Sequence, residues 1–373
     1  MKKRTLVIEF IVFILFSLPI FFQLASKTGT LAETLPPNHI HKGTAIVITG
    51  AAARIPQEAA LLEQLYNSGE LKDIAIISGA SSGSLNTVML NAILKGSFTW
   101  DRYKNVLYSL KNEDVFIRKD DKVPVDTRPL RELLERIVND TLGYYKMGDL
   151  PYASALSATN IEVIPSQERS YRFSNRKINK ESNPDCNLVD VLMASTAIPI
   201  VFPSVELNLQ GSRQPITFIN GGVAEDRIPF KAVIQHEQYT GIGVEKMIIV
   251  SKKSNHDPDI GAELKEIGIK DTKLLDKLGI SLQRYSKEGF IKKLKYLQKT
   301  YPDLASHTYI YVPDFDQDFS LLDFDILKEQ YQLSANWASS HKPILLAQYI
   351  TENDKPVKQV KTKDITGVKR KRT

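Results

Sequence analysis

The sequence predicts an α/β domain with a mainly parallel central sheet. Two runs rich in apolar and β-branched residues, Thr44–Thr49 and Asp73–Ser78, have the composition of strands buried on both faces. Pro56–Asn67 lies between them and repeats apolar residues at helical spacing, and the mostly apolar segment Ser84–Leu94 ends at Gly96. This β-α-β-α order predicts parallel strands joined by right-handed crossovers.

The rest of the chain continues the mixture of strands and helices. Strands are expected over Ser170–Asn175, Ile216–Gly221, Lys246–Lys252 and His307–Pro313, and helices over Arg128–Val138, Leu188–Ser195 and Leu274–Thr300. The last helix is rich in lysine, which is typical of a solvated outer helix, with a membrane-surface or partner-binding helix as the alternative. No linker interrupts this part, so residues 43–350 are predicted to form one domain.

Positive charge is concentrated at the C-terminal end. The formal net charge is +6, and Lys355–Arg372 contains eight Lys or Arg and one acidic residue, so the remainder is close to neutral. This distribution argues against a nucleic-acid-binding face on the folded body and predicts a basic, disordered tail over residues 351–373. The KRKR run in the tail can act as a nuclear localisation signal, but the N-terminal segment indicates a different cellular location.

The N-terminal segment has the features of a secretory signal. Three basic residues precede an apolar run, and Phe10–Phe22 carries no charge, as in the h-region of a signal peptide. Pro19 and the small residues Ala25 and Ser26 favour cleavage, although the uncharged stretch is also just long enough for a membrane span. We therefore expect a signal peptide, or alternatively a signal anchor, over residues 1–26 and a linker over 27–42, in a protein that enters the secretory pathway or is membrane-associated.

Ser81 stands at the centre of a Gly-x-Ser-x-Gly motif. Gly79 ends the second predicted strand and Gly83 precedes the helix, so the serine is expected on a strained strand-to-helix turn with its hydroxyl pointing out of the sheet. At that place the N-terminal end of the helix favours a developing negative charge. The motif predicts a nucleophile, with close strand–helix packing as the purely structural alternative.

A nucleophilic serine needs a base, and no histidine has a setting typical of a catalytic triad. The six histidines are His39, His41, His236, His256, His307 and His341. A carboxylate can serve directly as the base instead. The Gly221–Gly222 turn at the end of a predicted strand could present such a side chain, but the residue in that place is Asn220. Glu225 and Asp226 follow the turn, and we expect them to have a packing or surface role.

Cys186 is the only cysteine in the chain, so no internal disulfide can form. It lies in the polar stretch Asn183–Asn187 with no glycine-flanked turn around it. Cys186 is therefore not expected to replace Ser81 as a nucleophile.

Three separated blocks resemble the patatin-like phospholipase family of Ser–Asp acyl hydrolases. They are Gly79–Asn86 with its serine motif, Ala194–Leu207 (ASTAIPIVFPSVEL), and Ile219–Val223 (INGGV) at the place of the family's Asp-Gly-Gly turn. A weaker fourth block, Leu321–Gln332, resembles the C-terminal region of the family. Together with the first strand the blocks extend over Ala45–Gln332. The resemblance implies a three-layer α/β/α fold.

The same resemblance implies a lipid acyl hydrolase of the phospholipase or acylglycerol esterase type, a serine carboxylic-ester hydrolase. Ser81 would attack the ester carbonyl and form an acyl-enzyme, and Asn220 takes the position of the dyad aspartate. The family's oxyanion loop corresponds to Gly50, Ala51, Ala52 and Ala53, followed by Arg54. The implied substrate is a lipid or a membrane surface, and neither a metal nor another cofactor is implied.

Two departures from the family pattern fall on catalytic parts. The family loop reads Gly-Gly-Gly-x-Arg-Gly, and only Gly50 and Arg54 match it. An amide cannot accept a proton as a carboxylate does, so Asn220 removes a base whose assistance is worth roughly 10²–10⁴ in rate. The alternative is therefore a catalytically inactive member that binds a lipid or a protein partner. Acyl transfer to another lipid would use the same residues.

Overall fold

The computed structural model describes residues 40–117, 123–164, 166–179, 181–254 and 287–354. The expected signal segment, most of the linker and most of the basic tail lie outside these residues. Among the helices that are described, none combines the length and the apolar composition that a membrane crossing requires.

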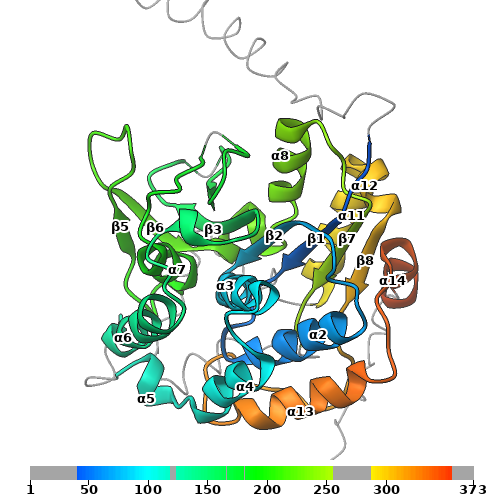
Figure 1. The fold of residues 1–373 in the computed structure, drawn as a ribbon, viewed down its shortest axis with the longest axis horizontal. Helices are drawn as coiled ribbons and strands as arrows, with labels where there is room; N and C mark the ends of the chain where they lie inside the picture. Colours follow the sequence, from blue (N-terminus) through cyan, green and yellow to red (C-terminus); the bar gives the residue numbers. More distant parts are fainter. Residues whose placement is uncertain (1–39, 118–122, 165, 180, 255–286, 355–373) are drawn as a thin grey trace, which may run out of the picture. The chain divides into compact units, whose positions relative to one another are not determined.

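A mixed sheet of nine strands forms the centre of the described part (Figure 1). Its order is β5–β6–β3–β2–β1–β7–β8–β9, with β4 paired to β3. The strands are β1 (Thr44–Ile48), β2 (Ile74–Ala80), β3 (Ser154–Asn160), β4 (Ser170–Ser174), β5 (Val205–Leu207), β6 (Ile216–Asn220), β7 (Lys246–Val250), β8 (Thr308–Tyr311) and β9 (Ile344–Leu345). Strands β3, β2, β1, β7 and β8 run parallel, which confirms the mainly parallel sheet.

Helices cover both faces of this sheet (Figure 1). One face is covered by α2 (Ile55–Asn67), α3 (Ser82–Lys95), α4 (Trp100–Ser109), α5 (Asn112–Val115), α6 (Arg128–Leu134), α7 (Leu188–Thr196) and α13 (Leu327–Ala338). The other is covered by α8 (Lys231–Thr240), α11 (Lys287–Thr300), α12 (Pro302–Ser306) and α14 (Leu346–Asn353). The described residues therefore form the expected α/β/α layers.

Strand β1 shows why the sheet must be covered on both sides. Ile46 and Ile48 belong to the core on the α2–α3 side, whereas Ala45 and Val47 belong to the core on the α8–α11 side. All four side chains have no exposed surface. Because successive residues of a strand point to opposite faces, a continuous apolar run is the pattern of a strand buried on both faces.

The observed elements β1, α2, β2 and α3 each begin and end within two residues of the bounds predicted from the sequence. The helix expected over Arg128–Val138 is α6 followed by a π-helix, η2 (Glu135–Thr141). Of the helix expected over Leu274–Thr300, the described part begins at Lys287. Strand β3 was not predicted, because its sequence SALSATN contains small and polar residues instead of large apolar ones.

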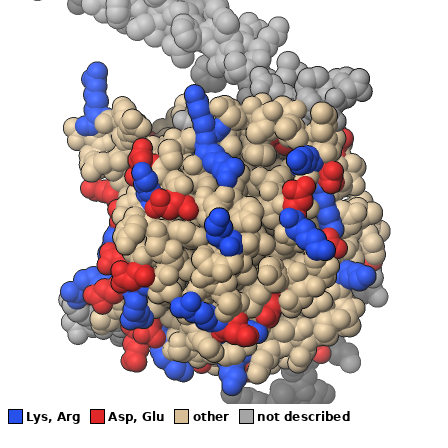
Figure 2. Space-filling view, in the orientation of Figure 1, with Lys and Arg blue, Asp and Glu red and all other residues tan. Residues whose placement is uncertain are grey.

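Basic and acidic side chains are intermixed on the visible face of the body (Figure 2). Many are paired: Arg131 with Asp190 at 2.7 Å and Lys246 with Glu70 at 2.6 Å are examples that join segments distant in the sequence. This agrees with the near-neutral charge that the sequence assigns to the body.

Candidate active site

Ser81 occupies the turn between β2 and α3 in a left-handed conformation, with φ +57°. Such a conformation costs about 1–3 kcal/mol for a residue other than glycine. The two neighbouring glycines leave room for it: a Cβ at Gly79 would lie 2.4 Å from the Gly83 carbonyl oxygen, and one at Gly83 would lie 2.3 Å from the Thr49 carbonyl oxygen. Strand and helix therefore pack closely through these glycines, with the serine at the tip of the turn.

Two strands converge on the site from opposite directions. Strand β2 runs parallel to β3 and ends where Ala80 pairs with Ser157, while β6 runs antiparallel to β3 and ends where Asn220 pairs with Ala158. The two ends thus meet at consecutive residues of β3. Gly221 permits the approach, because a Cβ there would lie 2.0 Å from the Ser157 carbonyl oxygen.

Asn220 is hydrogen-bonded directly to the serine. Its Nδ2 donates to Ser81 Oγ at 2.8 Å, and its Oδ1 accepts from the Gly222 N–H at 2.9 Å. The backbone N–H of Gly222 can only donate, so it fixes the amide orientation with the oxygen toward Gly222 and the NH₂ group toward Ser81. Both side chains are buried, with 6% of Ser81 and 7% of Asn220 exposed. Asn220 therefore positions the hydroxyl but cannot take its proton.

Ser195 and Ser84 form hydrogen bonds that hold the Ser81 turn in place. The sequence did not indicate either of them as a site residue. Ser195 Oγ accepts from the Ser81 N–H at 2.9 Å, donates to the Ser157 carbonyl at 2.6 Å and lies 2.8 Å from Ser84 Oγ. Ser195 belongs to the Ala194–Leu207 block, so the block contributes a residue that holds the backbone of the serine turn.

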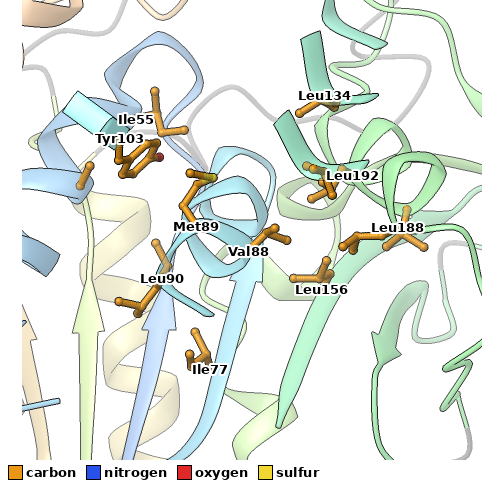
Figure 3. Packing of buried hydrophobic residues seen from close by; sticks show 14 of the residues in the cluster. Ile55, Ile77, Val88, Met89, Leu90, Tyr103, Leu134, Leu156, Leu188 and Leu192 are labelled. Atoms are coloured by element: carbon orange, nitrogen blue, oxygen red, sulfur yellow. The ribbon is translucent and has the colours of Figure 1, made fainter. Parts of the chain in front are cut away.

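An apolar cavity begins at Ser81 and extends between α3, α4, α6 and α7. The empty space in this cavity and its open mouth together is about 850 Å³. Figure 3 shows Val88 and Met89 of α3 flanked by Ile55 and Tyr103 on one side and by Leu134 and Leu192 on the other. Ser81, Ser82, Tyr103 and Thr196 are the polar residues of a lining that is otherwise aliphatic or aromatic. This chemistry suits a hydrocarbon chain with a reactive group at the serine end.

The loop after β1 uses two of its four N–H groups for structure. Ala51 N–H donates to Ser82 Oγ and Ala53 N–H donates to the Leu321 carbonyl, each at 2.8 Å. Ala52 lines the cavity and has φ +48°, a second left-handed residue beside Ser81. Gly50 packs against the serine, since a Cβ there would lie 2.9 Å from Ser81 Cβ. Arg54 is buried and donates to the Lys253 carbonyl at 3.0 Å, which ties the loop to the end of β7.

Comparison with known proteins agrees with this arrangement. The family model of patatin-like phospholipases matches residues 46–234. The chain belongs to the patatin-like phospholipase family.

Solved structures were also found that match the chain. Fourteen chains match, among them the crystal structure of VipD from Legionella pneumophila. It is 11% identical, with a TM-score of 0.33 over 82% of this chain and 68% of that chain. No curated protein matches the sequence.

In this patatin-like chain the carboxylates next to the Gly-Gly turn have other partners. Asp226 is fully buried, forms an ion pair with Arg172 (Nε to Oδ2, 2.6 Å) and accepts from Ser157 Oγ at 2.8 Å. Glu225 accepts from the N–H groups of Arg169 and Ser170 at 3.1 and 2.8 Å. Glu225 and Asp226 were expected to have a packing or surface role, and these contacts give both a structural role. Asp226 is not at the surface, because it is fully buried. Within the described residues, no carboxylate is hydrogen-bonded to Ser81 Oγ.

Buried polar and titratable side chains form a network next to the Gly50 loop. Glu58 accepts from Thr49 Oγ1 at 2.8 Å and from Asn86 Nδ2 at 3.3 Å, and Tyr103 OH donates to Asn86 Oδ1 at 2.6 Å. Burial raises the pKa of Glu58 to about 8, partly opposed by Lys252. Burial, with Arg227 and Arg54 nearby, lowers the pKa of Lys252 to about 7. The network links the loop, α2 and α3 to Tyr103 in the cavity wall.

Cys186, His41 and His341 have their contacts with residues other than Ser81. Cys186 is half-buried, and burial together with Asp185 raises the pKa of its thiol, so the reactive thiolate is disfavoured. His41 bonds to the Val244 carbonyl at 2.9 Å, and His341 stacks on Trp337 with 4.3 Å between ring centroids. His39 and His256 lie outside the described residues.

Proposed function

We propose that the protein binds the acyl chain of a lipid in the apolar cavity and hydrolyses its ester slowly through Ser81. The observation that carries this proposal is the position of Ser81 at the polar end of a cavity that is otherwise almost entirely apolar. Membership of the patatin-like phospholipase family supports the lipid substrate and the serine chemistry.

In this proposal Ser81 Oγ attacks the ester carbonyl carbon, the alcohol leaves with a proton, and water later releases the fatty acid from the acyl-serine. The negative carbonyl oxygen needs N–H donors, and we assign this role to the Ala52 N–H, because Ala52 lines the cavity, and to the N-terminal turn of α3 that follows Ser81. Asn220 Nδ2 stabilises negative charge on Oγ by donating to it. Removal of the Oγ proton is left to solvent water, and this makes the reaction slow.

A second candidate function is lipid binding without turnover. It is favoured by one specific observation: the side chain hydrogen-bonded to Ser81 Oγ is an amide and not a carboxylate. Binding would depend on the cavity alone, and the serine would remain unmodified. The acyl chain is the ligand in both cases, so only the reactivity of Ser81 separates them.

The test uses the full chain and a fluorophosphonate probe that labels reactive serines. We expect slow labelling of Ser81 and a low rate of p-nitrophenyl dodecanoate hydrolysis, both abolished in Ser81→Ala and unchanged in Ser306→Ala, which alters an exposed serine. Equal residual rates in the wild type and Ser81→Ala would rule out the hydrolase. If dodecanoate still bound to both proteins, the binding function would be the correct one.

A further inference from the structure

A groove lies on the outer side of the helices that cover the acyl cavity. One wall is formed by α4 and the residues beside it, including Phe98, Arg102 and Val106. The other wall is formed by α6 and the π-helix, including Leu133, Arg136 and Ile137. A π-helix is rare and often marks a functional position, and this one contributes both Arg136 and Ile137.

Only side chains separate the groove from the cavity at four positions. Val106, Leu110, Leu133 and Ile137 line both spaces and are half-buried, unlike deeper neighbours on the same helices such as Leu134, which are buried. Rotamer changes of partly exposed side chains are fast and break no backbone hydrogen bond. The cavity can therefore open into the groove without unfolding either helix.

The groove carries an excess of positive charge. Arg102 lies over the Phe98 ring, with 4.8 Å from the guanidinium carbon to the ring centroid, so its charge is held along the groove. Among the described residues, no carboxylate forms an ion pair with Arg102 or Arg136. Asp114 is the acidic residue in the lining, and its carboxylate accepts from the Lys111 N–H at 2.9 Å. Two arginines and one aspartate leave one net positive charge, which matches a monoanion.

We propose that this groove binds the carboxylate of a long-chain fatty acid, with the alkyl chain passing between Val106 and Ile137 into the cavity. Arg102 and Arg136 hold the carboxylate, a group that the planar guanidinium matches well. The alkyl chain occupies the space that an ester substrate needs, so the fatty acid competes with the substrate. The proposal rests on the proposed function only for the origin of this ligand, the product of ester hydrolysis.

Binding is measured by calorimetry on the full chain carrying Ser81→Ala, so that no turnover contributes. Four probes are used. Dodecan-1-ol has the chain of dodecanoate without the charge, acetate has the charge without the chain, and lysophosphatidate carries a phosphate in place of the carboxylate. We expect dodecanoate to bind most tightly and to lose affinity roughly fivefold with Arg102→Gln and again with Arg136→Gln, because both arginines are exposed. Arg213→Gln, which removes an exposed arginine outside the groove, is the matched control and should not change the affinity.

Several outcomes would overturn the proposal. Equal affinity for dodecanoate and dodecan-1-ol, or no effect of both arginine variants, would show that the groove does not hold the carboxylate. Binding of acetate as tightly as dodecanoate would indicate a simple anion site, and tighter binding of lysophosphatidate would indicate a phosphate head instead. All of these are binding results in Ser81→Ala, so they are independent of whether the wild type hydrolyses esters.

Discussion

Two buried polar pairs lie at consecutive residues of β3 and differ in charge. At Ser157 the Asp226 carboxylate accepts from the serine hydroxyl and forms an ion pair with the Arg172 guanidinium. At Ala158 strand β6 ends in Asn220, whose neutral amide bonds to Ser81. A buried carboxylate needs a cation or several hydrogen-bond donors, whereas an amide needs only its hydrogen bonds. The comparison teaches that the side chain next to Ser81 carries no charge and offers no base, although it holds the serine hydroxyl by a hydrogen bond.

The largest expected effect comes from placing a carboxylate at position 220, next to Ser81. Asn220→Asp keeps the Gly222 hydrogen bond and adds an acceptor for the Ser81 proton, so kcat/KM for p-nitrophenyl esters should rise by roughly 10²–10⁴. Asn220→Ala is the control and should not accelerate the reaction. An unchanged rate in a folded Asn220→Asp protein would mean that a missing base is not what limits the chemistry.

Breaking the charged pair should mainly reduce stability. Arg172→Met leaves Asp226 buried without its guanidinium, and we expect a loss of about 3–5 kcal/mol in the free energy of unfolding, measured with urea. Arg172 also pairs with the partly exposed Glu168, and Lys231 is the second partner of that carboxylate. Lys231→Met removes only this outer pair and should cost less than about 1 kcal/mol. Equal losses in the two variants would contradict the view that burial makes the Arg172–Asp226 pair critical.

The Glu58 network predicts a dependence of stability on pH. Burial raises the pKa of Glu58 from 4.5 to about 8, so the folded state binds a proton that the unfolded state has lost between these values. This contribution is fully present below pH 4.5 and is lost as the pH rises through about 8. Glu58→Gln lacks it, so urea unfolding between pH 5 and pH 8 should show the wild type losing stability relative to the variant. Parallel curves would indicate that Glu58 is ionised throughout.

The smallest effect is expected at the loop opposite Asn220. Ala52 has φ +48°, and relieving that strain by Ala52→Gly is worth about 1–2 kcal/mol, offset by about 0.5–1 kcal/mol of extra chain entropy in the unfolded state. We expect a gain in unfolding free energy of less than about 1.5 kcal/mol. Ala53→Gly, at a loop residue with negative φ, is the control and should destabilise the protein.

Much of the fold could be predicted from the sequence because β1, α2, β2 and α3 are local patterns. Their apolar periodicity and the glycines around Ser81 are visible within a few residues. Strand β3 could not be predicted in this way, because its small residues are buried only through distant partners, such as Gly221 against Ser157.

The site was predicted only in part, for the same reason. The resemblance placed Asn220 near Ser81, and the structure shows the hydrogen bond between them. It did not indicate Ser195 as the acceptor of the Ser81 N–H or Arg172 as the partner of Asp226, because both contacts join segments more than fifty residues apart. Nor could it indicate that Ala51 and Ala53 use their N–H groups for structure, since their acceptors are Ser82 and Leu321.

The convergence of β2 and β6 on consecutive residues of β3 has a consequence for how this site can change over time. The spacing between residues 81 and 220 follows from the pairing of both strand ends with β3, at Ser157 and Ala158, and not from the chemistry of either side chain. A lineage can therefore exchange the residue at 220 without moving the serine, and a carboxylate there would find hydrogen-bond donors in the Ser81 hydroxyl and the Gly222 N–H. In such a scaffold the residue facing the serine can differ between relatives while the apolar cavity stays the same.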